Sequence, residues 1–320
     1  MIRYIKKKLY SWVDKQFLDG CSSYNSLEVR RACRTKEQAR EKFRQHGIPF
    51  AEGKIWVWPW SAINFVKKYG YPVVVKPNLG GYSRGSYFPI TSKQGLRKAM
   101  LGVKVWWPRS VIEQYLRGKN YRVVVTREGV QIVTRRFPPF VVGDGMKNIS
   151  QLIDEENQIR REMKLLPIIH EIEKSKDVVR FLKKQGLALD SVPALDHEVE
   201  LFHRVALSPG GVLETIDMSC IPQKNIDLFA KVLRIFDANI LGIDVIMEKG
   251  VEIPFDEQKT IFLEVNSRPY LKMHAVPRWG DVPDMKALYQ KLDALKVDDR
   301  DVYGREVSRS TLNFFKWGTI

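Results

Sequence analysis

The sequence lacks any run of about eighteen apolar residues, the length that a membrane-spanning helix needs. It has three scattered cysteines (Cys21, Cys33 and Cys220), and this spacing fits neither a disulfide framework nor a zinc site. Residues 1–17 contain no apolar core of a secretory signal peptide. We therefore expect a cytoplasmic protein with reduced thiols, and neither a disulfide-stabilised nor a membrane-spanning one.

Acidic residues are scarce relative to basic ones. The chain has 37 Asp and Glu against 53 Lys and Arg, which gives a formal net charge of +16. Such a charge favours an anionic partner: nucleotide phosphates, an acidic polymer, nucleic acid or an anionic membrane surface. Charge alone does not choose among these. The 320 residues are 44% hydrophobic, enough for a sizeable core in one large lobe or several smaller ones.

Residues 1–17 have the pattern of a basic amphipathic helix. Their apolar residues recur at helical spacing: Ile2, Ile5, Leu9, Trp12, Val13 and Phe17. Such a helix can lie on an anionic membrane surface. Docking on the protein itself or on a second subunit is the alternative that we favour, so a homo-oligomer is among the expected forms.

Caps, turn residues and hydrophobic periodicity divide the rest of the chain into helices and strands. We expect helices at 35–45, 62–69, 92–101, 225–239 and 285–295, and strands at 72–76, 87–90, 111–115, 121–126, 130–136 and 201–207. Residues 150–200 are helical and heavily charged, which is typical of an insertion or an exposed helical arm. Strands and helices mix without a regular βαβ alternation, so the pattern favours an α+β fold.

Three oxygen-bearing side chains lie on two apolar strand segments near the C-terminal third. Asp244 lies within residues 242–246, and Glu264 and Asn266 follow about twenty residues later. Because side chains alternate along a strand, Glu264 and Asn266 point to the same face. Such donors on adjacent strands suit a magnesium ion shared between the protein and nucleotide phosphates. Two buried strands with solvated acids at their ends are the alternative.

A lysine at the end of a predicted strand is followed by a glycine-rich loop. Lys76 precedes the stretch Gly80-Gly81-Tyr82-Ser83-Arg84-Gly85. Backbone N–H groups of such a loop can wrap phosphate oxygens while the lysine supplies a positive charge. The loop is not a P-loop, because no Gly-Lys-Ser/Thr follows at the required distance. A hairpin tip without a ligand is the alternative.

A third candidate is the segment Glu113-Gln114-Tyr115-Leu116, where an apolar strand ends and the chain turns through Gly118 into the next strand. A backbone in this position can hydrogen-bond to the edge of an adenine ring. The alternative is an ordinary strand–turn–strand connection.

Taken in order, Lys36, Lys76 with its loop, residues 113–116, Asp244 and Glu264-x-Asn266 resemble the ATP-grasp superfamily over residues 27–295. The chain is more closely similar to the ATP-grasp module of cyanophycin synthetase and its relatives. That likeness rests on Arg136-Phe137-Pro138-Pro139, Gly143-Asp144-Gly145, Leu207-Ser208-Pro209-Gly210-Gly211 and Met273-His274.

The resemblance implies an α+β, ATP-grasp fold: two lobes of antiparallel sheet plus helices that grip ATP, with a charged helical insertion. It implies the following division of the chain: an N-terminal basic amphipathic helix and linker (1–26), the N-terminal part of the core (27–71), the small lobe with the glycine-rich loop (72–116), the large lobe with the insertion at about 150–200 (117–297), and a C-terminal tail (298–320).

It also implies roles for individual residues. ATP would be bound by Lys36, Lys76, Gly80, Gly81, Ser83, Gly85, Glu113, Gln114, Tyr115, Leu116 and Asn120. Mg²⁺, as two ions and with Mn²⁺ as an alternative, would be held by Asp244, Glu264 and Asn266. Arg136 and Arg268 would be catalytic and lie near the transferred phosphate or the acyl group.

The implied reaction is ADP-forming ligation of a carboxylate to an amine through an acyl phosphate, which yields a peptide or isopeptide bond. The substrate would be an amino acid or a short acidic peptide. Asn120 stands where the family usually has an acid, Ser83 where glycine is usual, and Ala206 where asparagine is usual. Asn120 and the net charge motivate an alternative: a catalytically reduced ATP-grasp-fold protein that binds nucleic acid or another anionic polymer.

Overall fold

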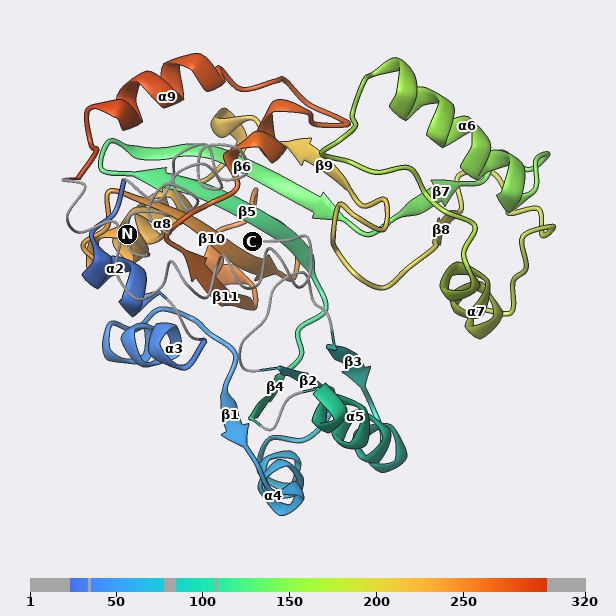
Figure 1. Cartoon of the computed structure of the whole chain (residues 1–320), viewed down its shortest axis with the longest axis horizontal. Coiled ribbons are helices and arrows are strands. Elements are labelled where there is room, and N and C mark those ends of the chain that lie inside the picture. Colours follow the sequence, from blue (N-terminus) through green and yellow to red (C-terminus); the bar gives the residue numbers. More distant parts are fainter. Residues whose placement is uncertain (1–23, 34–35, 78–84, 107–108, 298–320) are drawn as a thin grey trace, which may run out of the picture. The chain divides into compact units, whose positions relative to one another are not determined.

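The computed structural model describes residues 24–33, 36–77, 85–106 and 109–297 of the chain (Figure 1). They belong to two compact units. Unit 1 takes its residues from 1–133, 217–271 and 284–320, and unit 2 from 134–216 and 272–283. Buried hydrophobic clusters lie within each unit, so each has a core of its own.

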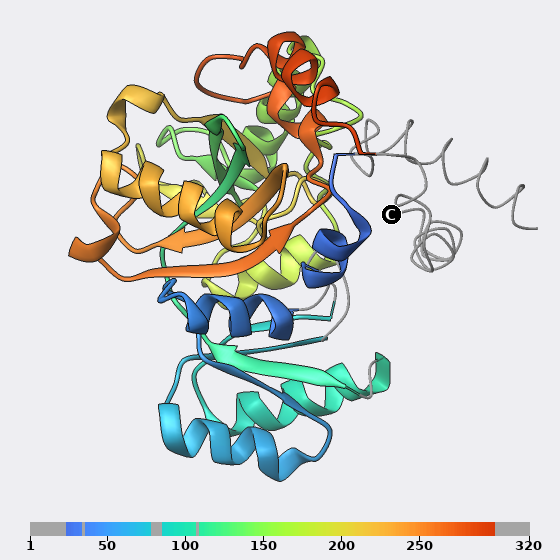
Figure 2. The ribbon, with the colours of Figure 1, turned by 90° about the vertical axis from the view of Figure 1, so that its left-hand side faces the viewer.

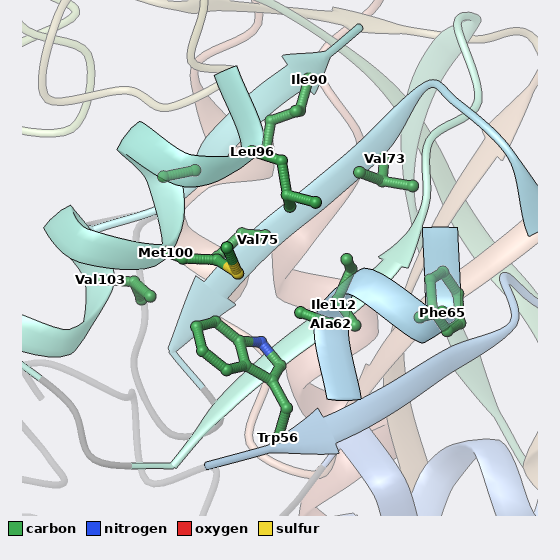
Figure 3. Packing of buried hydrophobic residues seen from close by; sticks show 11 residues of the cluster. Trp56, Ala62, Phe65, Val73, Val75, Ile90, Leu96, Met100, Val103 and Ile112 are labelled. Atoms are coloured by element: carbon green, nitrogen blue, oxygen red, sulfur yellow. The ribbon is translucent and has the colours of Figure 1, made fainter. Parts of the chain in front are cut away.

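The first sheet of unit 1 has the strand order β1-β4-β2-β3, and neighbouring strands are antiparallel. Its strands are β1 (Gly53–Trp56), β2 (Val73–Pro77), β3 (Tyr87–Ile90) and β4 (Ser110–Gln114). Helices α4 (Pro59–Tyr69) and α5 (Lys93–Trp106) pack on this sheet. Figure 3 shows side chains of both helices around Val75 and Ile112, with Trp56 at the edge of the cluster. Because side chains alternate along strands, Lys76 and Glu113 project from the opposite face.

Two helices of this lobe begin or end differently from expectation. Helix α4 begins at Pro59, three residues before the expected start, because proline is well suited to the first helical turn. Helix α5 continues through Gly102 to Trp106, past the expected end at Leu101. A Cβ atom at position 102 would collide with the Tyr87 hydroxyl, so the glycine lets β3 lie close to the helix.

The second sheet contains β11 (Thr260–Asn266), β10 (Ile240–Met247), β5 (Lys119–Thr126) and β6 (Gly129–Phe137), in that order. All eight residues of β10 are buried, as expected for a central strand. The helices of this part are α2 (Leu27–Ala32), α3 (Lys36–Gln45), α8 (Gln223–Ile235) and α9 (Met285–Asp293). Helix α3 packs against β11, where the rings of Phe43 and Phe262 are 5.9 Å apart.

Asn25, just before α2, joins the ends of two strands of this sheet. Its buried side chain donates hydrogen bonds of 2.8 Å to the carbonyls of Ile240 and Ser267. Its amide oxygen accepts from the Asn239 N–H at 2.8 Å. The start of β10 and the turn after β11 are thereby bound to the same amide.

Unit 2 begins where β6 passes residue 133. Residues Thr134–Phe137 of β6 pair with β9 (Val212–Thr215), and β7 (Phe140–Val142) pairs with β8 (Glu198–Glu200). Helix α6 (Ile149–Glu162) starts with a capping box between Asn148 and Gln151, and α7 (Lys176–Lys184) starts at Ser175. Both helices bury apolar residues in one cluster with β7 and β8: Val141, Ile149, Leu152, Ile153, Ile172, Val178, Leu182, Val199 and Leu201. Residues 150–200 therefore build a core, and the interpretation as an exposed arm is wrong.

The expected strand at 201–207 is absent, which corrects that prediction. Of its residues only Leu201 is buried, and backbone groups of the segment bond to isolated partners instead of a strand ladder. For example, the Leu201 N–H donates to Pro139 O at 2.8 Å, and the Leu207 carbonyl accepts from the His170 N–H at 3.3 Å. Four short strands were not predicted: β1, β7, β8 and β9.

The basic segment 1–17 and the tail 298–320 lie outside the described residues. Within the described ranges, no helix combines the length and hydropathy that crossing a bilayer requires.

Candidate active site

Asp244 and Glu264 are register partners on the antiparallel strands β10 and β11, and Asn266 is the partner of Gly242. A β-bulge follows Asp244 in this pairing. Since residues two apart share a face and paired residues lie side by side, all three oxygen-bearing side chains belong to one face of the sheet. The structure thus brings the three predicted metal ligands together on adjacent strands.

Each of the two carboxylates is paired with its own cation. Lys36 Nζ, at the first residue of α3, lies 2.9 Å from Glu264 Oε2. Arg122 of β5 binds Asp244 through both oxygens, with Nε–Oδ1 at 2.5 Å and Nη2–Oδ2 at 3.1 Å. Arg122 is the register partner of Asp244, and Asp244 is the partner of Glu264, so the row across β5, β10 and β11 carries one positive charge followed by two negative charges.

The ion pair between Lys36 and Glu264 keeps both groups charged. The positive charge of Lys36 holds the pKa of the Glu264 carboxyl well below its usual range, against the opposing effect of burial. Burial by itself would lower the pKa of Lys36, but the charge and hydrogen bond of Glu264, together with the charges of Glu113 and Asp244, outweigh it and raise that pKa above its ordinary value. Glu264 is therefore a carboxylate at neutral pH.

These residues fit a magnesium site. Two carboxylates and an amide are hard oxygen donors, and Mg²⁺ in nucleotide sites takes one or two carboxylates together with phosphate oxygens. Among the described residues there is no group of three His, Cys, Asp or Glu side chains that could hold a metal, so phosphate or amide oxygens would have to complete the coordination. The Asn266 Nδ2 atom is buried without a hydrogen-bond partner in the described part, so no such bond fixes the orientation of its amide.

Lys76 belongs to a second group of charges on the first sheet. Its ammonium group forms a short ion pair with Glu113 Oε1, and Arg40 Nη1 of α3 lies 3.1 Å from Glu113 Oε2. Gly53 makes room for this contact, because a Cβ there would lie 2.5 Å from Arg40 Nη1 and 2.9 Å from Glu113 Cβ. The carboxylate of Glu113 thus binds two cations, and contact with an adenine edge would fall to the backbone of this segment.

The two charge groups influence each other. Burial lowers the pKa of Lys76, the charge of Lys36 lowers it further, and the charges of Glu113 and Glu264 oppose the shift. The charge of Glu113 also contributes to the raised pKa of Lys36. We treat these six residues as one charge cluster: Lys36, Arg40, Lys76, Glu113, Asp244 and Glu264. Both lysines face anionic groups that a nucleotide could replace.

The predicted adenine segment already uses some of its backbone donors. The Gln114 N–H donates to Glu52 O at 2.9 Å, and the Tyr115 N–H donates to Pro72 O at 3.1 Å. The rings of Tyr115 and Phe88 lie 6.2 Å apart in a stacked arrangement. An adenine edge would therefore meet the carbonyls of this segment and the backbone of Leu116.

Asn120 and Gly85 complete the predicted nucleotide contacts within the described ranges. Asn120 lies on β5, two residues before Arg122 and opposite Ile246. Its side-chain Nδ2 atom donates a hydrogen bond of 3.5 Å to the Gly118 carbonyl oxygen. Gly85 has a φ of +69° at the end of the glycine-rich loop, a conformation that favours glycine. The remaining predicted loop residues, Gly80, Gly81 and Ser83, lie outside the described residues.

The two predicted catalytic arginines lie in different units. Arg136, on β6 in unit 2, is half-buried and is the register partner of Leu213 on β9. Arg268, in unit 1, is half-buried and follows Asn266 by two residues.

Sequence reasoning missed Arg40, Arg122 and Gly242. Gly242 leaves space above the metal-ligand face, because a Cβ there would lie 2.8 Å from Pro269 Cβ and 3.0 Å from Arg122 Nη1. The signal for Arg122 was its place two residues after Asn120, which puts both on one face of β5. Its contact with Asp244 depends on the strand register, which the spacing of residues does not reveal.

No protein-family model matches the chain. Over 261 residues the chain is 33% identical to the cyanophycin synthetase of Synechocystis sp., a match that covers 79% of this chain and 29% of that protein. The chain therefore spans less than a third of the length of this curated relative. The predicted similarity to cyanophycin synthetases is confirmed.

Two solved structures show the fold. The bifunctional glutathione synthetase from Pasteurella multocida matches with a TM-score of 0.60 at 21% identity, over 85% of this chain and 38% of its own. The D-alanine–D-alanine ligase from Bacillus anthracis matches with a TM-score of 0.50 at 15% identity, over 91% of this chain and 72% of its own. Both are ATP-grasp proteins, and this chain has the ATP-grasp fold, as the resemblance implied.

Proposed function

We propose that this chain, which has the ATP-grasp fold, is an ADP-forming ligase that joins a carboxylate to an amine. One observation carries the proposal: Asp244, Glu264 and Asn266 share one sheet face, and Lys36 and Lys76 belong to the same charge cluster. The similarity to a relative named as a synthetase supports it, whereas nothing in the comparisons supports the nucleic-acid alternative.

In this proposal Lys36 and Lys76 exchange their carboxylate partners for phosphate oxygens of ATP. Asp244, Glu264 and Asn266 hold Mg²⁺, and we propose two ions, with Mn²⁺ as a substitute. The bound metal would neutralise charge on the phosphates. Glu113 holds Lys76 in place before the nucleotide binds, and Arg122 orients Asp244. Residues 113–116, Asn120 and the loop from Gly80 to Gly85 bind the rest of the nucleotide.

The proposed reaction has two steps. A substrate carboxylate oxygen attacks the γ-phosphorus, the bond to the bridging oxygen breaks, and ADP leaves. The amine nitrogen then attacks the acyl carbon of the acyl phosphate, phosphate departs with the electron pair of the C–O bond, and the nitrogen loses a proton. Arg136 and Arg268 would stabilise negative charge on the transferred phosphoryl or acyl group.

The substrate proposal is an amino acid or a short acidic peptide, and the net charge of +16 supports an acidic one. A cytoplasmic location and a homo-oligomer belong to the same set of proposals, with membrane contact as the alternative role of residues 1–17. For the division of the chain we propose a nucleotide-gripping core at 27–297, with 1–26 and 298–320 as flanking segments.

The test measures ADP release from the full chain with ATP, Mg²⁺ and a panel of carboxylate and amine pairs. Asp244→Asn and Glu264→Gln should each lower the rate by about 100-fold or more, because each removes charge from the proposed metal site. They should also abolish the magnesium-dependent stabilisation of the protein by ATP in thermal unfolding.

Asp256→Asn is the matched control. It neutralises an exposed acid of unit 1 that pairs with Lys224 at 2.8 Å. It should release ADP as the unmodified protein does. Unchanged activity in Asp244→Asn or Glu264→Gln would reject the metal assignment, and absence of any ADP release with every acid and amine would reject the ligase proposal.

A further inference from the structure

The basic residues are concentrated in one lobe of the protein. Residues 53–112, which form the first sheet with α4 and α5, contain no Asp or Glu. The same stretch contains ten basic residues: Lys54, Lys67, Lys68, Lys76, Arg84, Lys93, Arg97, Lys98, Lys104 and Arg109. Lys76 faces the candidate active site, so that site does not account for the lysines and arginines on the outer side of the helices.

The outer sides of α4 and α5 belong to one surface. Both helices cover the same face of the first sheet (Figure 2). By strand alternation, Lys76 and Glu113 belong to the opposite face. On α5, Lys93, Arg97 and Leu101 are exposed and follow one another at four-residue spacing, so they form a stripe. On α4, the exposed residues Trp60, Ile63 and Lys67 form a second stripe.

Large apolar side chains lie among these charges. Trp58 and Trp60 are 61% and 59% exposed, and their rings stack on each other at 5.2 Å with an interplanar angle of 2°. Leu101 is 74% exposed. Exposed tryptophan and leucine flanked by lysine and arginine is the composition of surfaces that lie in the interface of a lipid bilayer.

We propose that this α4–α5 face (Trp58, Trp60, Ile63, Lys67, Lys68, Arg97 and Leu101) docks on an anionic phospholipid membrane. The lysines and arginines attract anionic headgroups, and the indole rings and aliphatic side chains enter the boundary between headgroups and acyl chains. The aliphatic residues favour a membrane over a soluble polyanion, since they offer no base-stacking surface and no charge. Lys76 lies on the opposite face of the sheet, so docking of the α4–α5 face on a membrane would leave Lys76 accessible to nucleotide.

Sedimentation of the full chain with vesicles tests the proposal. The protein should bind vesicles of equal parts phosphatidylcholine and phosphatidylglycerol, and should not bind phosphatidylcholine alone. The double variant Lys67→Glu/Lys68→Glu should weaken partitioning onto anionic vesicles by roughly 30-fold or more. This follows because each basic residue near an anionic surface contributes to membrane binding, and the variant replaces two of them with acids. Trp58→Ser/Trp60→Ser and Leu101→Ser should weaken it as well.

Two control variants match these changes outside the lobe. Lys183→Glu/Lys184→Glu alters an adjacent, exposed lysine pair in the last turn of α7, with the same change in net charge. Leu195→Ser alters a leucine that is 69% exposed. Both controls should bind anionic vesicles nearly as the unmodified protein does. Equal losses in the controls and in the α4–α5 variants would overturn the proposal.

A second measurement separates this face from residues 1–17. Brominated acyl chains should quench tryptophan fluorescence on vesicle binding, and Trp58→Phe/Trp60→Phe should remove most of the quenching. Quenching that disappears instead with Trp12→Phe would assign the contact to the N-terminal segment and overturn the proposal.

A soluble polyanion is the other possible partner of this face. Binding to single-stranded DNA or polyglutamate that requires Lys67 and Lys68, with no vesicle binding, would assign the face to such a polyanion and would also overturn the proposal.

Discussion

Asp244 and Glu264 are paired across two neighbouring strands, and each holds a different cation, Arg122 and Lys36 respectively. Four charges of unit 1 therefore lie side by side on α3, β5, β10 and β11. Removing one partner of a buried pair weakens the compensation of the other charge, so these two ion pairs can be tested by stability as well as by activity.

The bidentate contact of Arg122 gives the first prediction. Arg122→Met should lower the free energy of unfolding by about 3–5 kcal/mol, because it removes the bidentate cation from the buried Asp244 carboxylate. Urea unfolding of metal-free protein measures this. Arg127→Met is the control: Arg127 pairs with Asp237 on the surface at 2.9 Å and should cost about 1 kcal/mol or less. Equal losses would contradict the buried-pair interpretation.

Glu113 and Lys76 give a prediction about pH. Lys76 can attract phosphate only while it is protonated, and burial already lowers its pKa, with Glu113 opposing the shift. Glu113→Gln removes that opposition, so the pKa of Lys76 should fall further. The measurement is the affinity for ATP as a function of pH. As the pH rises, the variant should lose this affinity at a lower pH than the unmodified protein does. Glu52→Gln is the control, because Glu52 is a more exposed acid near Arg44. This variant should leave the pH dependence of ATP affinity unchanged.

His203 gives a prediction about the stability of unit 2. Its pKa is lowered to about 4, first by burial and then by the charges of Arg204 and Lys184. The unfolded chain binds the proton near its ordinary pKa of about 6.5, so unfolding is favoured as pH falls from about 6.5 towards 4. In urea unfolding, the free energy of unfolding of the His203→Gln variant should fall less over that pH range than that of the unmodified protein. An identical pH dependence in both proteins would show that His203 does not contribute.

Trp56 and Trp60 give a matched pair of core and surface variants. Trp56 is 1% exposed in the cluster of Figure 3, so Trp56→Ala should lower the free energy of unfolding by about 3–5 kcal/mol. Trp60 is exposed, so Trp60→Ala should remove mainly the stacking with Trp58, which contributes about 1 kcal/mol. Chemical denaturation compares the two. A larger loss in Trp60→Ala would contradict the packing described for this lobe.

Much of the fold could be predicted where local signals are strong. Helix α3 and strands β2 to β6 were predicted within a few residues, because apolar periodicity and turn residues mark them. The convergence of Asp244, Glu264 and Asn266 could be predicted from strand alternation and from the resemblance to ATP-grasp proteins.

The rest depended on contacts between distant segments. Strands β1 and β9 have four residues each, too few for a clear alternation pattern. Arg40 reaches Glu113 because Gly53 on β1 has no side chain, and β1 itself was not predicted. The apolar residues at 201–207 suggested a strand, but they contact other parts of unit 2 through single backbone bonds.

The buried amide of Asn25 sets a practical boundary for handling this protein. A shortened version that starts after residue 25 would leave the Asn239 N–H and the carbonyls of Ile240 and Ser267 without this shared partner. Ser267 stands between Asn266 and Arg268, so trimming the N-terminal side would loosen the turn that carries a proposed metal ligand and a proposed catalytic arginine. A shortened version of the chain should therefore retain Asn25.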